Sequence, residues 1–399
     1  MEKLKIALFH PWIKSRGGAE RLILEWLKRT MHDVDIYTWA YLPDKTYDEF
    51  KQFNITVIKT PFQKHLNSFI TRGLSFGFTA LTKKIDLTKY DLLLYSTAGV
   101  AELMAIKNHL NKTIFLCYTP LRAALKDDIK WNLKNRFKNP IIQLIYLLGV
   151  LVYTILEKRA WKNANKVIFD SVLAKNRALD KKLIIESKTS VIYPAVDLKK
   201  STIKPKNSNY FLYVARIGMA KRQLALINGW KKFVEHHPEY QLYLVGSIFD
   251  SSASKYVTKV KHAVETTKNV ILKTDVSNTE LDKLYSEATA CLNVPFHEDF
   301  GIVPFEVVAH NKPLISVDFG GFVELLKNHK GIVWLPETLD NNVLSERIYS
   351  ALEEFISKKD KISKMAKYGK KFIQSQNLTW DSFAKQLDEV LNENIGECN

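Results

Sequence analysis

Arg216 and Lys221 are the two cations whose spacing most clearly suits a chemical role. They flank the short segment Ile-Gly-Met-Ala, directly after an apolar run that we predict to be a strand. Arginine chelates two oxygens and lysine supplies a point charge, so the pair suits a pyrophosphate. Both interactions strengthen as charge develops on a departing nucleotide diphosphate. The alternative is an ordinary solvated basic loop.

Two carboxylates, Glu298 and Glu306, enclose a segment that contains Gly301. Carboxylates only accept hydrogen bonds and hydroxyls donate them, so we expect one acid to bind sugar hydroxyls and the other to hold a ribose diol. The alternative is an acid placed near a helix start because the helix dipole favours it there.

Two glycine pairs, Gly17-Gly18 and Gly320-Gly321, each stand where a strand is predicted to give way to a helix. Glycine lets the backbone approach a ligand closely, and the free N–H groups of a helix start attract phosphate. The alternative for each pair is a tight turn that only serves packing.

The hydrophobic pattern places these residues at the ends of alternating strands and helices. Predicted strands of the first half are 4–9, 34–38, 55–58, 92–96, 113–117, 166–169 and 190–193. Predicted strands of the second half are 210–215, 241–245, 270–273, 290–294, 313–317 and 331–335. The clearest helices are 19–29, 223–236 and 344–357. Strands separated by crossover-length segments indicate an α/β fold with parallel sheets, which bind ligands beyond the carboxyl ends of their strands.

The polar stretch 199–209 follows Pro194 and is predicted to be a linker. We therefore expect two Rossmann-like, doubly wound domains that face each other across a cleft. The expected ranges are 1–198 for an acceptor-binding domain, 199–375 for a nucleotide-sugar-binding domain, and 376–399 for a C-terminal helix that packs back on the first domain.

The composition favours anionic partners without choosing among them, because the formal net charge is +17. The aromatic residues show no spacing typical of nucleic-acid binding, so we expect no nucleic-acid partner. The three cysteines have no paired spacing, and no cluster of His, Asp and Glu has metal-ligand spacing. We expect neither metal nor cofactor. The start of the chain lacks the pattern of a signal peptide, so we expect a cytoplasmic protein.

The longest apolar run, 141–156, is flanked on both sides by basic residues. A helix over this run reaches only about 24 Å, short of a bilayer core of about 30 Å. Its apolar residues surround the helix, which favours a buried core helix. The alternative is a surface helix that lies on an acidic membrane.

Taken together in this order, the motifs resemble glycosyltransferase family 4, the retaining enzymes with the GT-B fold, and within it the mannosyltransferase-like branch of polysaccharide and lipid-linked glycan synthesis. The resemblance runs over nearly the whole chain. The motifs that carry it are Phe9-His10-Pro11-Trp12, Gly17-Gly18-Ala19-Glu20-Arg21, Tyr90-Asp91-Leu92, Thr119-Pro120-Leu121-Arg122, Val191 to Asp197, Arg216 with Lys221, Glu298 to Glu306, and Gly320-Gly321 with Glu324.

The resemblance implies roles for these residues. Arg216 and Lys221 would hold the donor diphosphate, Glu298 would touch the transferred sugar, and Glu306 would bind the ribose. The remaining donor-binding positions would be Gly17, Gly18, Phe300, Gly301, Ile302, Val303, Gly320 and Gly321. Transfer would occur on the front face with retention, and the leaving phosphate would help to deprotonate the acceptor.

The resemblance also implies partners: a nucleotide sugar, GDP-mannose or a UDP-sugar, and a glycan or lipid-linked acceptor. The basic residues that flank 141–156 would allow contact with an anionic membrane at its cytoplasmic face. Thr119 and Arg122 would lie on the acceptor side. Tyr118 stands where the family usually has His. It is expected to orient the sugar with its phenol, and the alternative is a catalytically silent module that binds nucleotide sugars or glycans.

Overall fold

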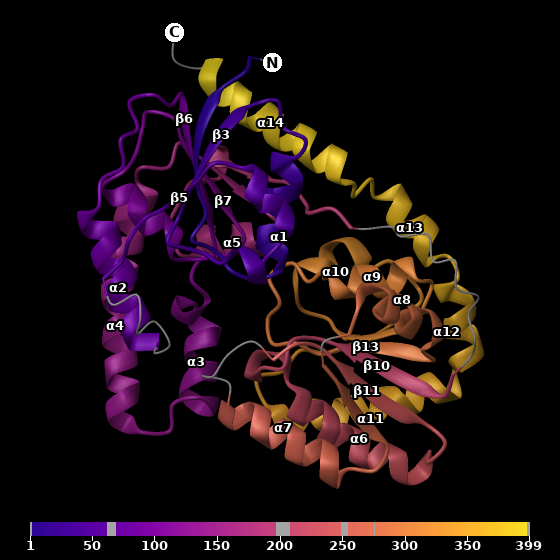
Figure 1. The fold of residues 1–399 in the computed structure, drawn as a ribbon. Helices are drawn as coiled ribbons and strands as arrows, with labels where there is room; N and C mark the ends of the chain where they lie inside the picture. The colour runs from indigo at the N-terminus through magenta and orange to yellow at the C-terminus, as the bar shows by residue number, and fades with distance from the viewer. Residues whose placement is uncertain (1, 62–68, 197–207, 249–253, 275, 397–399) are drawn as a thin grey trace. The chain divides into compact units, whose positions relative to one another are not determined.

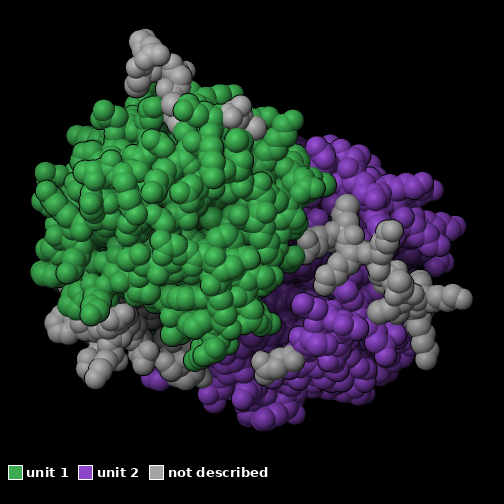
Figure 2. Space-filling model, turned by 45° about the horizontal axis from the view of Figure 1, so that its top comes forward, with its two compact units in different colours: residues 1–195, 379–399 green, residues 196–378 purple. Residues whose placement is uncertain are grey.

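The computed structural model describes residues 2–61, 69–196, 208–248, 254–274 and 276–396 (Figure 1). The chain divides into two compact units, coloured separately in Figure 2. Unit 1 contains residues 1–195 and 379–399, and unit 2 contains residues 196–378. Most of the predicted linker 199–209 lies outside the described residues.

Unit 1 is built on a seven-stranded sheet in which every pairing is parallel. The order is β5-β3-β1-β6-β7-β8-β9. The bounds are Lys5–Phe9 for β1, Asp33–Thr38 for β3, Ile55–Val57 for β5, Leu92–Thr97 for β6, Thr113–Cys117 for β7, Lys166–Phe169 for β8 and Thr189–Val191 for β9. The strand order reverses between β1 and β6, and ligands of such sheets bind beyond the strand ends at this point.

Alternate residues of these strands enter two separate cores. Leu8 of β1 packs with helix α1 (Gly18–Leu27) and with α14 (Trp380–Gly396). Its neighbour Phe9 packs on the other face, against α2 (Phe69–Thr82) and α5 (Val172–Asp180). Helix α14 belongs to unit 1 although it follows unit 2 in the chain. Trp26 Nε1 of α1 donates a 2.7 Å hydrogen bond to Asp388 Oδ1 of α14, and the two helices lie together in Figure 1.

Unit 2 is built on a six-stranded parallel sheet in the order β12-β11-β10-β13-β14-β15. The bounds are Tyr210–Val214 for β10, Gln241–Val245 for β11, Val270–Lys273 for β12, Ala290–Asn293 for β13, Leu314–Val317 for β14 and Ile332–Leu335 for β15. Its helices are α6 (Gln223–His236), α7 (Ser254–Thr266), α8 (Asn278–Glu287), α9 (Val303–Ala309), α10 (Gly321–Leu326), α11 (Asn341–Ser357), α12 (Lys359–Ala366) and α13 (Gly369–Ser375). Here the strand order reverses between β10 and β13.

The prediction of a buried core helix over 141–156 is wrong. Helix α4 (Pro140–Trp161) covers this run, and its apolar side chains are largely exposed, with Ile141 68% and Ile155 61% accessible. Only one narrow stripe, which includes Tyr146, Glu157 and Trp161, is buried against unit 1. The apolar pattern did not reveal this because it extends around the helix, and the tertiary contacts of unit 1 use only one side of it.

Candidate donor and acceptor sites

Lys221 and Glu298 form an ion pair in unit 2. Lys221 follows β10 and Glu298 follows β13, and these two strands are neighbours in the sheet. Their side chains are about three-quarters buried, at 23% and 24% accessible. The segments that carry them are joined by a 2.7 Å hydrogen bond from Phe296 N to Ala220 O. The parallel sheet therefore brings a cation and an acid together at the point where its strand order reverses.

Arg222, one residue beyond this lysine, was not predicted as important. It adopts a left-handed conformation with φ of 55° and ends its turn with the side chain only 1% exposed. Its Nη1 donates a 2.8 Å hydrogen bond to Glu337 Oε1, and its guanidinium lies 5.0 Å from the ring centroid of Phe296. Burial raises the pKa of Glu337, and the charge of Arg222 opposes that shift. The Arg222–Glu337 pair therefore ties the loop that follows β10 to the segment that follows β15.

Arg216 is not brought into this ion pair. Its side chain is exposed and pairs with no acid in the described part of the chain. Its backbone is held instead, because Gln223 Nε2 donates a 2.8 Å hydrogen bond to the Arg216 carbonyl oxygen. The guanidinium therefore projects from a backbone that helix α6 anchors.

The glycines after β13 and β14 position Glu298. Gly301 has φ of +81° and Gly320 has φ of +148°, and a Cβ at Gly320 would stand 2.4 Å from the Phe322 ring. Glu298 and Gly320 form an isolated parallel bridge. Gly321 N donates a 3.0 Å hydrogen bond to Asp299 O. The Gly320-Gly321 pair and the Glu298 segment, predicted separately, thus lie side by side.

Glu306 lies in the first turn of α9 and is partly buried. Its Oε2 accepts a 2.8 Å hydrogen bond from the hydroxyl of Tyr285, a side chain only 1% exposed. Ile302 precedes this helix and Val303 begins it, while Phe300 stacks on Phe305 with ring centroids 4.9 Å apart. The hydrogen bond from the buried Tyr285 therefore limits the rotamers that Glu306 can adopt.

In unit 1, the Glu20 carboxylate lies over the first turn of α1. Gly17 precedes the helix and Gly18 begins it. The Glu20 carboxylate turns back over this start, since a Cβ at Gly17 would lie 2.3 Å from its Oε2. Ser15 Oγ donates a 2.8 Å hydrogen bond to the other oxygen of Glu20. A Cβ at Gly18 would meet nothing within 4 Å, so the open backbone of this turn is at Gly18.

Tyr118 ends a buried chain of polar side chains at the carboxyl ends of three strands. Its hydroxyl lies 2.7 Å from Ser96 Oγ, which lies 2.8 Å from Nδ1 of His10. Burial lowers the pKa of His10 to about 4 and raises the pKa of Tyr118. The chain is therefore neutral near pH 7. The sequence indicates His10 only as part of a motif, because the pairing of β1, β6 and β7 is what brings it close to Tyr118.

Thr119 and Arg122, predicted on the acceptor side, are held by partners within unit 1. Thr119 is 3% exposed and its Oγ1 accepts a 3.3 Å hydrogen bond from Arg177 Nη1. Arg122 pairs with Asp128 at 2.9 Å and is about one-quarter exposed. Both side chains therefore brace the loop that follows β7.

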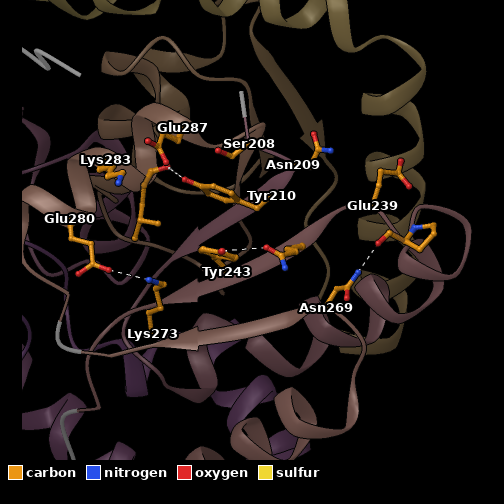
Figure 3. A pocket seen from close by; sticks show the side chains of 13 residues that line it. Ser208, Asn209, Tyr210, Glu239, Tyr243, Asn269, Lys273, Glu280, Lys283 and Glu287 are labelled. Atoms are coloured by element: carbon orange, nitrogen blue, oxygen red, sulfur yellow. Dashed lines mark hydrogen bonds and ion pairs between the residues drawn. The ribbon is translucent and has the colours of Figure 1, made fainter. Parts of the chain in front are cut away.

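A separate cavity of about 640 Å³ in unit 2 contains none of the predicted site residues. Its lining includes Tyr210, the first residue of β10, which Figure 3 shows. Gln241, the first residue of β11, lines it as well. Lys273 and Glu280 pair across it at 3.1 Å. Ligands of doubly wound sheets bind beyond the carboxyl ends of the strands where the strand order reverses, which in unit 2 is between β10 and β13. We therefore place the candidate donor site around Lys221 and Glu298.

Comparison with known proteins finds a family match in unit 2. Residues 196–372 match the model described as "Glycosyl transferases group 1", which covers almost all of unit 2. Unit 2 therefore contains a group 1 glycosyl transferase domain. The chain is 22% identical to "Alpha-1,3/1,6-mannosyltransferase ALG2" of Eremothecium gossypii, over 98% of this chain and 84% of that one. It is 29% identical to "O-antigen chain mannosyltransferase RfbU" of Salmonella typhimurium over 48% of this chain and 51% of that one.

Solved structures share the fold of this chain. A glycosyltransferase from Rickettsia africae superimposes with a TM-score of 0.67 at 17% identity, covering 100% of both chains. Anabaena HepE, solved in complex with UDP-glucose, gives a TM-score of 0.68 at 17% identity over 98% of this chain and 100% of that one. The predicted α/β architecture of two Rossmann-like domains, the GT-B fold, is confirmed. Hexosyl transfer, the predicted activity, is likewise supported by the family match.

Proposed function

We propose that this glycosyltransferase moves mannose from a nucleotide diphosphate donor to a glycan or lipid-linked acceptor, with retention and without a metal. The main support for the donor site is the Lys221–Glu298 ion pair, which lies where the strand order of the unit 2 sheet reverses. The mannosyl donor rests on the names of the two relatives described above, both of which are mannosyltransferases. A nucleotide diphosphate fits a structural neighbour that was solved with UDP-glucose.

In this proposal the ion pair is exchanged when the donor binds. The diphosphate attracts the ammonium of Lys221, and the hydroxyls of the sugar donate hydrogen bonds to the released Glu298 carboxylate. Arg216, exposed on an anchored backbone, adds a second cation for the diphosphate. Because the charge on the diphosphate grows as the glycosidic bond breaks, these cations stabilise the transition state more than the bound donor. Glu306, held by Tyr285, would accept hydrogen bonds from the ribose.

Unit 1 would contribute the acceptor side through Tyr118. A neutral phenol in the chain Tyr118–Ser96–His10 can donate one hydrogen bond to a sugar or acceptor oxygen, which is the orienting role that we propose for it. Tyr118→Phe keeps the ring and removes this donor. We expect about a tenfold lower kcat with an unchanged donor KM. A kcat equal to that of the wild type would contradict the role.

A ligand screen tests the donor. A ligand that binds only the folded protein raises its melting temperature, so GDP-mannose, UDP-glucose and the free nucleotides are compared by thermal shift. We expect GDP-mannose to give the largest shift and to support transfer. A UDP-sugar that stabilises the protein and is transferred, with no effect of GDP-mannose, would contradict the proposed donor and leave the proposed site intact.

We further propose that the enzyme works at the cytoplasmic face of a membrane, where a lipid-linked acceptor would be presented. The support is the +17 charge, which favours anionic surfaces. Fractionation of cells tests the location, and recovery of the enzyme only in the soluble fraction at low ionic strength would contradict it.

A further inference from the structure

Helix α4 of unit 1 presents an exposed apolar stripe. Its members cover the part of the helix that does not contact unit 1, and each is at least 41% accessible. They are Ile141, Ile142, Leu144, Ile145, Leu147, Leu148, Leu151, Val152 and Ile155. From the first to the last, the stripe is about 21 Å long. Soluble proteins rarely expose so much contiguous apolar surface unless something binds there.

The opposite side of α4 is fixed to unit 1 by buried polar contacts. Near its start, Tyr146 OH donates a 2.5 Å hydrogen bond to the Ala123 carbonyl oxygen. Further along, Tyr153 OH donates to Glu102 at 2.8 Å, and Glu157 pairs with Lys181. The helix is long and apolar enough to cross a membrane. Because these contacts occupy one side of the helix, lipid cannot surround it as it would a membrane span, and only the stripe remains exposed.

A groove of about 690 Å³ adjoins the carboxyl end of this stripe. It is lined by the cations Lys158, Arg159 and Lys162 and by the apolar Ile155, the last member of the stripe. Within the described part of the chain, no carboxylate pairs with any of these three cations. His109 also lines the groove, and its Nδ1 lies 3.0 Å from the Ala105 carbonyl oxygen. The groove thus combines unpaired positive charge with an apolar wall.

We propose that this groove binds the phosphate headgroup of an anionic phospholipid while the α4 stripe lies among the acyl chains beside it. A phosphate headgroup binds cations, and acyl chains bind apolar surface. Because the cations and the apolar stripe lie next to each other here, the ligand that suits them is amphipathic. A second copy of this chain suits the surface less well. In a dimer the three cations of one copy would either face the same three cations of the other or have no anionic group to bind. The inference gives the membrane contact in the proposed function a specific site, and it does not depend on the identity of the donor.

Sedimentation with vesicles tests the site in the full-length protein. Vesicles of phosphatidylcholine alone are compared with vesicles that also contain phosphatidylglycerol. We expect the wild type to bind the mixed vesicles more tightly. The triple variant Lys158→Glu, Arg159→Glu, Lys162→Glu should bind them at least about tenfold more weakly, since each cation near an anionic surface contributes to binding. The variant Leu148→Ser, Leu151→Ser should bind both kinds of vesicle more weakly.

Matched controls separate the site from general charge. Lys361→Glu, Lys364→Glu, Lys367→Glu makes the same charge change on and just after α12 of unit 2, where these lysines are exposed. We expect this control to lose less than about threefold in binding, because none of these lysines lines the groove. Ile185→Ser removes an apolar side chain that is 63% exposed elsewhere in unit 1, and it should bind as the wild type does.

Two results would overturn the proposal. One is an equal loss of vesicle binding in the groove variant and in the α12 control. The other is a wild type that ignores vesicles and forms dimers by light scattering, which Leu148→Ser, Leu151→Ser converts to monomers; the stripe would then be an interface between copies. A thermal shift with nucleotide sugar is measured on every variant. Because Lys221 and Glu298 lie in unit 2, the thermal shift should be the same in every variant. This separates failure of the groove as a lipid site from failure of the proposed donor.

Discussion

At the scale of single residues, Lys221 is predicted to matter for transfer and little for folding. Its pair with Glu298 is about one-quarter exposed, and such pairs contribute at most about 1 kcal/mol to stability. Loss of a cation that stabilises developing charge costs about 100- to 1000-fold in rate. Lys221→Ala should therefore lower kcat/KM by this factor while the melting temperature falls by no more than a few degrees. Lys232→Ala, which breaks the exposed pair with Glu346 in the same unit, should change neither.

Arg222, the adjacent residue, is predicted to behave in the opposite way. Arg222→Met leaves Glu337 buried without its partner, which costs about 3–5 kcal/mol. We expect a clearly lower melting temperature of unit 2 by calorimetry. The double variant Arg222→Met, Glu337→Leu removes both charges and should recover part of the loss. An Arg222→Met variant with full stability and no activity would show instead that this guanidinium contacts substrate.

At the scale of elements, the two predicted glycine pairs should respond differently to alanine. Gly320→Ala forces a Cβ to 2.4 Å from the Phe322 ring at φ of +148°, so we expect a loss of at least about 2 kcal/mol in unfolding free energy and weaker transfer. Gly18→Ala meets no atom and lies in a helix, where alanine is favoured by up to about 1 kcal/mol. Stability should rise there. A donor affinity that also stays unchanged would contradict a phosphate at this helix start.

At the scale of the whole molecule, the buried acids beneath α4 should make stability depend on pH. Burial raises the pKa of Glu102 to about 7, against an ordinary value near 4.5. Between these values the folded state binds more protons than the unfolded state, so the unfolding free energy falls as pH rises, by up to about 3 kcal/mol. Glu157, Lys181 and Tyr153 face the same network.

Glu102→Gln removes this titration and keeps a polar side chain. We expect the wild-type melting temperature to fall more steeply than that of the variant between pH 5 and pH 8, with the two closest at the acid end. Glu346→Gln, on an exposed acid, should leave the wild-type slope in place. Equal slopes for wild type and Glu102→Gln would contradict a raised pKa.

The sequence by itself determined the strands, the parallel α/β class and the loops that carry Lys221, Glu298 and Glu306. This was possible because apolar periodicity is local, and because the carboxyl ends of parallel strands must meet at one edge of a sheet. The small pairing of β2 (Trp12–Ile13) with β4 (Ala40–Tyr41) was too short to leave such a pattern.

Only the tertiary structure decided which charges are buried and which apolar side chains are not. Arg222 and Lys221 are adjacent in sequence, yet one is sealed against Glu337 and the other faces Glu298, because a left-handed turn separates their directions. Helix α4 is apolar around its circumference, and nothing local states which side unit 1 covers. Burial depends on contacts between residues distant in the chain, and such contacts leave no periodic signal in the sequence.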